Sequence, residues 1–387
     1  MSFRDRILRV YRRGPDAPLV WQPRLEHWFH VNRREGTLPE KYRSSELSDI
    51  YDDLGASVRY FWLPEGIRVI HGPGVSVERR EENGYWYTRW STPMGELVRV
   101  ERVTWDSCMT VKFPIENLRD MSVMEYVLRG DRYEFDPQAF HWALAEVGDR
   151  AAPTVILPRI NLQRLFIDFV GYERTIFFLY DHPQETESLI QAIDEADDRL
   201  CAVVKDAPYD LVNFGDNVHS DLLPPTLFEQ YVFPRYRELA VLFHGAGKFC
   251  YPHWDGKVKP LMRYAQSCGF DGIEAITFEP QGDVSIEESK EAMGDVILID
   301  GLPAVLFLPG FSESELEKYT RRVIEAFQPN IILGISDELP PGGDIERCRL
   351  VSKIVAEYNS RSSKQQGSVH RLPMPAHTPH GGTMPLS

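Results

Sequence analysis

From about residue 150 to residue 358, short apolar runs alternate with longer stretches whose apolar positions recur every three or four residues. The short runs predict β-strands, and the longer stretches predict amphipathic helices. This alternation is typical of βα units whose strands form a parallel sheet. The predicted strands of this region are 154–157, 211–214, 248–251, 272–276, 296–299 and 330–333.

The predicted helices begin close to Ser, Asp or Pro residues, which are preferred at helix N-termini. They cover residues 225–244, 285–292, 312–327 and 344–358, and residues 1–14 add an amphipathic helix. In the first half, residues 19–22 and 56–61 predict two more strands, with a helix at 40–54 between them. Eight strands with helices between most of them predict a (β/α)8 TIM barrel, an α/β fold.

Residues 68–103 depart from the barrel pattern because polar and apolar side chains alternate there. Asn83-Gly84 and Met94-Gly95 are turn signals inside this stretch, so we predict antiparallel β-hairpins inserted into the barrel. A single domain over residues 1–358 accommodates both parts. The polar composition that follows predicts a disordered C-terminal tail over residues 359–387.

The charge balance of the chain limits its partners. It has 58 acidic and 43 basic residues, a net charge of −15, which argues against nucleic acid or an anionic membrane. Five cysteines without a CxxC pair indicate neither a disulfide framework nor a four-cysteine zinc site, so reducing cytoplasm is the expected location. No apolar run approaches the roughly 20 residues of a membrane span. A small-molecule substrate fits this composition best.

In a TIM barrel the active site lies at the carboxyl ends of the strands, so polar residues just after each predicted strand are the candidates. Those expected to bind substrate are Arg24, Arg159, Asn213, Asn217, His219 and Glu274. His253 and Asp216 are the candidates for proton transfer, although Asp216 also fits a helix cap. Further carboxylates follow the late strands at Asp300, Asp337 and Glu338.

The segment 248–256 carries the strongest single signal, because an apolar run ends in His253-Trp254-Asp255. Side chains alternate along a strand, so His253 and Asp255 would share a face while Cys250 would point into the core. Zinc bound by His253, Asp255 and either Asp337 or Glu338 would leave one position open for substrate. A metal-free site with His253 as general acid or base is the alternative, and residue spacing does not separate the two.

Several segments resemble the uroporphyrinogen decarboxylase superfamily over nearly all of residues 1–358. They are Arg4-Asp5-Arg6-Ile7-Leu8, Gly215-Asp216-Asn217, the block 228–253 and Asp344-Ile345-Glu346-Arg347. Members of this superfamily are βα barrels, which agrees with the strand count. The resemblance to true decarboxylases is weaker, because their Phe-Ser-Asp segment is replaced by Tyr60-Phe61-Trp62 and their arginine-rich run is missing.

His253-Trp254-Asp255-Gly256 is similar to the His-x-Cys-Gly zinc motif of the cobalamin-linked methyltransferases in the superfamily. Asp255 replaces the first cysteine ligand and Asp337 the second, with Ser336 and Glu338 as alternatives. The resemblance implies a metal-dependent methyltransferase that moves a methyl group from a small O-methyl substrate to a corrinoid on a separate partner protein. Carboxylate ligands would make the zinc harder, which suits polarising an ether oxygen.

The resemblance leaves a second activity open, a cofactor-free decarboxylase acting on a carboxylated substrate, with Asp216 and His253 handling protons. A third possibility is a binding protein that has lost its catalytic residues. The density of polar residues after the predicted strands argues against this third possibility.

Overall fold

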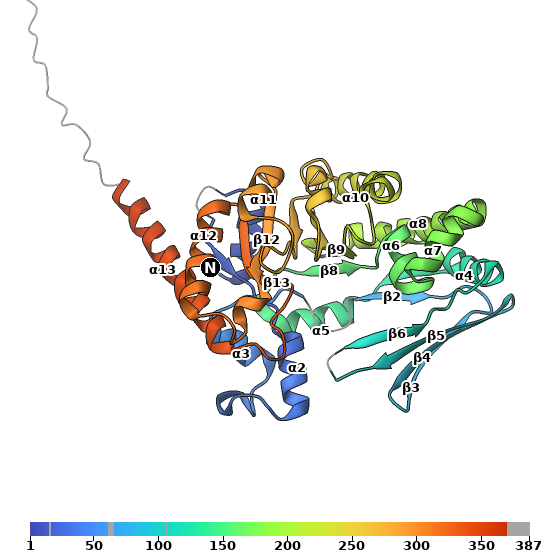
Figure 1. The fold of residues 1–387 in the computed structure, drawn as a ribbon, viewed down its shortest axis with the longest axis horizontal. Helices are drawn as coiled ribbons and strands as arrows, with labels where there is room; N and C mark the ends of the chain where they lie inside the picture. The colour runs from blue at the N-terminus through green and yellow to red at the C-terminus, as the bar shows by residue number, and fades with distance from the viewer. Residues whose placement is uncertain (15–16, 61–65, 106, 370–387) are drawn as a thin grey trace, which may run out of the picture.

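The computed structural model describes residues 1–14, 17–60, 66–105 and 107–369, with the backbone alone for 362–369. Within these residues, seven parallel strands form one curled sheet in the order β1-β13-β12-β11-β10-β9-β8 (Figure 1). The strands are β1 (Val20–Trp21), β8 (Thr154–Leu157), β9 (Leu211–Val218), β10 (Phe249–Trp254), β11 (Gly272–Glu274), β12 (Ile297–Pro303) and β13 (Ile331–Ser336). Each of the six strands predicted after residue 150 is present, and the barrel-like α/β fold is confirmed.

The predicted strand at 56–61 is corrected by the structure, because residues 56–59 are buried and Tyr60 is half-buried, but they form no regular ladder. They fill the gap between the two edge strands of the sheet. The amide of Ser57 donates to the Trp21 carbonyl of β1 at 2.8 Å, and the amide of Val58 donates to the Arg150 carbonyl near β8 at 3.0 Å. An irregular segment therefore takes the place of the second strand, and Phe61 lies outside the described residues.

Helices surround the sheet, and two of those predicted begin at the expected serine caps. Ser285 and Ser312 each form a capping box with a glutamate three residues later. The predicted helix at 225–244 is divided by a π-helical turn at Phe228–Val232. The helices are α1 (Phe3–Tyr11), α2 (Glu26–Glu35), α3 (Leu47–Leu54), α4 (Leu118–Gly130), α5 (Pro137–Val147), α6 (Asn161–Arg164), α7 (Tyr172–Asp181), α8 (Pro183–Asp206), α9 (Pro225–Leu227), α10 (Phe233–Gly245), α11 (Ile286–Met293), α12 (Glu313–Phe327) and α13 (Ile345–Val369).

The inserted hairpins form as expected and extend beyond the predicted range. β3 (Ser76–Glu82), β4 (Tyr85–Thr92), β5 (Gly95–Val103) and β6 (Cys108–Lys112) make an antiparallel sheet, and β2 (Ile67–Ile70) pairs with β7 (Arg132–Phe135). Asn83 and Gly84 connect β3 to β4 with φ values of 54° and 78°. Two successive positive φ values are those of a type I′ turn, which explains the Asn-Gly pair.

The N-terminal helix closes one end of the barrel. Ile7 and Tyr11 of α1 belong to a buried cluster that includes Leu211, Ile297 and Ile332, which lie at the beginnings of β9, β12 and β13. The beginnings of the strands are thus sealed by apolar contacts. Polar groups in the barrel interior gather toward the opposite, carboxyl ends of the strands.

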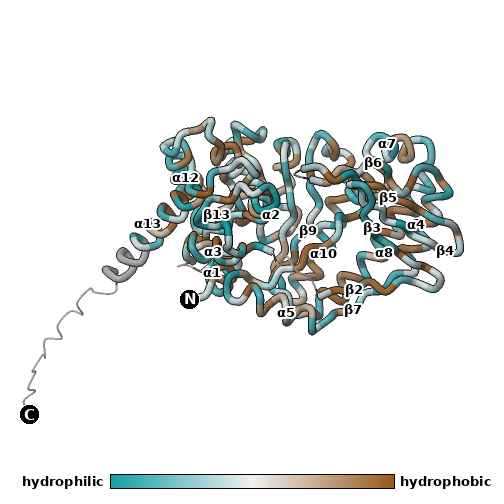
Figure 2. The backbone as a smooth tube through the Cα atoms, turned by 90° about the horizontal axis from the view of Figure 1, so that it is seen from below, coloured by the Kyte–Doolittle hydropathy of each residue, from teal (hydrophilic) through white to brown (hydrophobic). Residues whose placement is uncertain are grey.

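Hydrophobic and hydrophilic segments alternate along the chain, as the colouring in Figure 2 shows. No helix in the described part of the chain combines the length and apolar character needed to cross a membrane.

Helix α13 continues to Val369, so its end overlaps the range predicted as a tail. Residues 370–387 lie outside the described residues, and the tail there stays a prediction.

Candidate active site

His253 and Glu274 form the centre of the candidate site. They lie at the carboxyl ends of the neighbouring strands β10 and β11, where they are register partners. Nδ1 of His253 lies 3.2 Å from Oε2 of Glu274, and both side chains are buried. The hydrogen bond fixes the orientation of the imidazole and leaves Nε2 as its second functional nitrogen.

The carboxylate of Glu274 is saturated with hydrogen bonds. Oε1 accepts from Nη1 of Arg59 at 2.7 Å and from the Tyr60 hydroxyl, while Oε2 also accepts from Nδ2 of Asn213 at 2.7 Å. Burial alone would raise the pKa of Glu274, but the charge of Arg59 and the hydrogen bond from His253 hold it well below its usual range. Asn213 and Glu274 are therefore brought together, and their contact with substrate stays a prediction.

Arg59 is a central residue that the sequence analysis did not identify. Its guanidinium is buried and also donates to Asp300, with Nη1 2.8 Å from Oδ2. Burial raises the pKa of Asp300 to about 6 even though the charge of Arg59 opposes the shift. The sequence did contain a signal for Arg59, because this charged residue directly follows Ala56-Ser57-Val58. A cation inside a mostly apolar run needs a buried partner.

Arg24 and Asp337 lie on the other side of His253. Nε2 of His253 is 3.8 Å from Oδ1 of Asp337, and Nη1 of Arg24 donates to the same oxygen. Nη2 of Arg24 is 3.6 Å from Oε2 of Glu338. Burial lowers the pKa of His253, but the hydrogen bond to Glu274 and the charge of Asp337 outweigh it and raise the pKa to about 9. His253 is therefore an imidazolium at neutral pH.

Asp216, predicted for proton transfer, points away from this group. Its Oδ1 accepts from the amide of Ile160 at 2.8 Å, and its Oδ2 accepts from the hydroxyl of Tyr236 on α10 at 2.6 Å. Burial raises the pKa of Asp216 to about 6, against the hydrogen bonds that favour the charged form. These contacts are structural, because they connect β9, α10 and the segment after β8, and proton transfer by Asp216 stays a prediction.

Arg159, Asn217 and His219 gather at the ends of β8 and β9. Nη1 of Arg159 is 3.1 Å from Oδ1 of Asp168, and its Nη2 is 3.4 Å from Oδ1 of Asn217. His219 accepts from the amide of Asp221 through Nδ1 at 3.1 Å and borders Gly256. The side chain of Arg159 keeps 29% of its surface exposed, so it remains accessible to a ligand.

The arrangement does not fit the predicted zinc site. Among the described residues, one group of three His, Cys, Asp or Glu side chains has its ligand atoms within 4.8 Å of one another, and it is not His253, Asp255 and Asp337. Asp255 is half-buried, and its amide donates to the Val218 carbonyl at 3.0 Å. The guanidinium of Arg24 already occupies the position of a cation beside Asp337. His253, Asp255 and Asp337 therefore lack the geometry of a zinc site.

Residues 165–358, half of the chain, match the model of the uroporphyrinogen decarboxylase (URO-D) family. The chain belongs to this family. The barrel expected from the resemblance is thereby explained, and the matched range contains most of the polar residues at the strand ends. No curated protein sequence matches this URO-D family chain.

Two solved structures similar to this URO-D family protein are methyl-transfer enzymes by name. A methyltransferase from Methanosarcina mazei is 14% identical, with a TM-score of 0.59. The match covers 92% of this chain and 99% of the methyltransferase chain. A B12-independent methionine synthase from Shewanella is 12% identical, with a TM-score of 0.42. This match covers 86% of this chain and 91% of the synthase chain. At such identities the first likeness shows the fold alone, and the second is too distant to carry an argument.

Proposed function

We propose that this URO-D family protein is a methyltransferase that moves a methyl group from a small O-methyl substrate to a corrinoid on a separate partner protein. The observation that carries the proposal is the imidazolium of His253, held by Glu274 at the carboxyl ends of the strands. When bound, the corrinoid supplies the nucleophile that accepts the methyl group. His253 supplies the proton that the departing oxygen needs.

The chemistry of the transfer determines the role of His253. The bond between the methyl carbon and oxygen breaks, and the oxygen keeps the electron pair. A proton from Nε2 of His253 converts the leaving alkoxide or phenolate into a neutral alcohol, as a general acid does. Glu274 then stabilises the ring through Nδ1 and sets which nitrogen delivers the proton.

The charges around His253 favour a neutral reacting group. Arg59 is paired with Glu274 and Asp300, and Arg24 is paired with Asp337 and approaches Glu338. Burial raises the pKa of Glu338 to about 7, so only about half of this carboxyl is ionised at neutral pH. No cation in this group is left without an anion, and an ether oxygen therefore suits the position beside His253 better than a carboxylate. Arg159 is accessible to bind a polar end of the substrate.

The decisive experiment incubates the purified chain with free cob(I)alamin and either methanol or a methoxyphenol, and follows formation of methylcobalamin by absorbance. The His253→Gln variant is expected to transfer methyl groups about 10²- to 10⁴-fold more slowly, which is typical for loss of a general acid. His30→Gln on the exposed face of α2 is the matched control and should keep the full rate. Equal rates in the two variants, or no transfer from either donor, would contradict the proposal.

A cofactor-free decarboxylase is the second candidate, because the imidazolium of His253 is also placed to protonate a carbanion. This activity predicts release of carbon dioxide from a carboxylated substrate without any corrinoid. Incubation with carboxyl-labelled aromatic acids and measurement of the released label separates it from methyl transfer. The paired state of Arg24 and Arg59 makes the methyl ether the preferred substrate class.

A further inference from the structure

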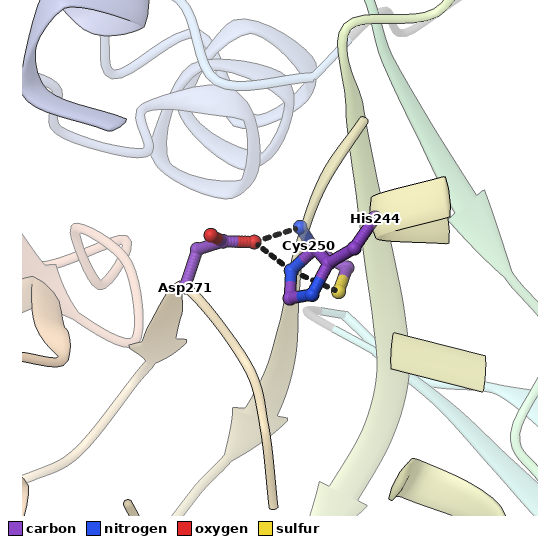
Figure 3. Close-up of side chains that lie close together, drawn as sticks. All are labelled: His244, Cys250 and Asp271. Carbon is purple, nitrogen blue, oxygen red and sulfur yellow. Dashed lines mark hydrogen bonds and ion pairs between the residues drawn. The ribbon is translucent and has the colours of Figure 1, made fainter. Parts of the chain in front are cut away.

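A second cluster of chemically capable side chains lies at the opposite end of the strands from His253. His244 is near the end of α10, Cys250 is the second residue of β10, and Asp271 immediately precedes β11 (Figure 3). The inward-facing Tyr251 belongs to the barrel interior, so its neighbour Cys250 points outward, toward α10. The cluster is thus separated from the candidate active site by the length of β10 and by the face of the strand.

The three side chains converge on one point. Nε2 of His244 is 2.9 Å from Oδ2 of Asp271 and 3.9 Å from Sγ of Cys250. Figure 3 shows the imidazole directed between the thiol and the carboxylate. One ligand atom from each residue lies within 4.8 Å of the other two. We propose that His244, Cys250 and Asp271 bind a zinc ion.

The distances match the needs of a tetrahedral ion. Zinc bonds of about 2.0 to 2.3 Å to nitrogen, oxygen and sulfur place neighbouring ligand atoms about 3.4 Å apart. The observed separations of 2.9 and 3.9 Å lie on either side of that value, so small side-chain movements admit the ion. Three protein ligands leave the fourth position for water, and the 41% exposure of the His244 side chain provides an entry path.

The same geometry argues against a nucleophilic cysteine. In a cysteine–histidine–carboxylate triad, the thiol and the carboxylate contact opposite nitrogens of the imidazole. Here Cys250 and Asp271 both face Nε2 of His244, as ligands around a common centre do.

The charge of Asp271 also distinguishes this cluster from the candidate active site. In the part of the chain that the structure describes, no lysine or arginine forms an ion pair with the Asp271 carboxylate. Its partners are His244 and the amide of Cys250, which donates to Oδ2 at 2.8 Å. By contrast, Arg24 already neutralises Asp337 beside His253. An ion at the cluster would tie α10 to β10 and β11 and would stabilise the fold.

The test is a Co²⁺ titration of the full chain, since cobalt replaces zinc and its thiolate complexes absorb in the near ultraviolet. The background variant carries His370→Ala, His377→Ala and His380→Ala, which removes adventitious ligands near the C-terminus. About one Co²⁺ per chain should bind with a thiolate band. Cys250→Ser should abolish the band, and His244→Ala should weaken binding at least tenfold.

Two controls make the assignment specific. Cys108→Ser, at an exposed cysteine, and His253→Gln should leave the band and the affinity unchanged. Failure of the background variant to develop a thiolate band would overturn the proposal without depending on whether any ligand variant folds. A band that persists in Cys250→Ser, or that disappears in His253→Gln, would also overturn it. Methyl transfer is tested separately, so either proposal can fail alone.

Discussion

His253 and Glu274 stand opposite each other in the register of β10 and β11, with Nδ1 and Oε2 3.2 Å apart. Neither residue reaches water freely, so each depends on the other and on the arginines nearby for its charge state. A change in the protonation of this pair should therefore change the stability of the barrel.

Stability should fall as the pH rises through the titration of His253. The pKa of its imidazole is raised to about 9, above the value of about 6.5 expected in the unfolded chain. The stabilising effect of the charged ring is therefore complete below about pH 6.5 and is lost between about pH 6.5 and 9. Urea denaturation should show the free energy of unfolding decreasing by up to about 3 kcal/mol across this window. An equally steep decrease in His253→Gln would contradict the assignment.

Arg59→Met should destabilise the protein strongly. The substitution leaves Glu274 and Asp300 buried without their shared cation, and breaking a buried pair in this way costs about 3 to 5 kcal/mol. Arg33→Met is the matched control, because the Arg33 pair with Glu46 is exposed and solvent-exposed ion pairs add little to stability. Chemical denaturation of both variants at pH 7 measures the difference. Similar values for the two would refute the central role of Arg59.

Gly256→Ala should displace His219. Gly256 has a φ of 70°, and a Cβ atom added there would lie 2.5 Å from Cδ2 of His219. Gly36→Ala is the control, since Gly36 has a φ of 69° and no neighbour within 4 Å. In both variants an alanine must adopt a left-handed backbone conformation, which costs about 1 to 2 kcal/mol. Gly256→Ala should destabilise the protein further, because its Cβ meets His219. Imidazole NMR signals should shift for His219 only in Gly256→Ala, and an unchanged spectrum would count against the contact.

Tyr236→Phe should raise the pKa of Asp216 above its present value of about 6. The lost hydroxyl donates to the charged form of the carboxylate, so its removal favours the protonated form. Destabilisation of about 1 to 3 kcal/mol is expected at pH 7, where the buried carboxylate loses a donor, with a smaller effect below pH 5. Carbon NMR of the carboxyl group and denaturation at both pH values measure these changes. If Asp216→Asn abolished methyl transfer and left stability intact, a catalytic role would replace the structural one.

Local sequence signals predicted the elements they control. Ser285 and Ser312 fix the starts of α11 and α12 through capping boxes, and Asn83-Gly84 specifies the turn between β3 and β4. The segment 56–60 resembles a strand in composition, yet its amides bond to β1 and to Arg150 without a ladder. Its conformation depends on closure of the barrel, which involves residues far apart in the chain.

From residue 154 onward the sequence by itself determined the order of the strands, and it placed His253, Glu274 and Asp337 at or just after strand ends, because periodicity is local. Asp300, expected just after a strand, lies within β12. Only the tertiary structure decided which of these groups meet. The inward direction of Asn213 brings it to Glu274, whereas Asp216 is directed to Tyr236. Arg59 acquires its partners across more than 200 residues of sequence. Such contacts arise from the closure and register of the sheet, which no local pattern encodes.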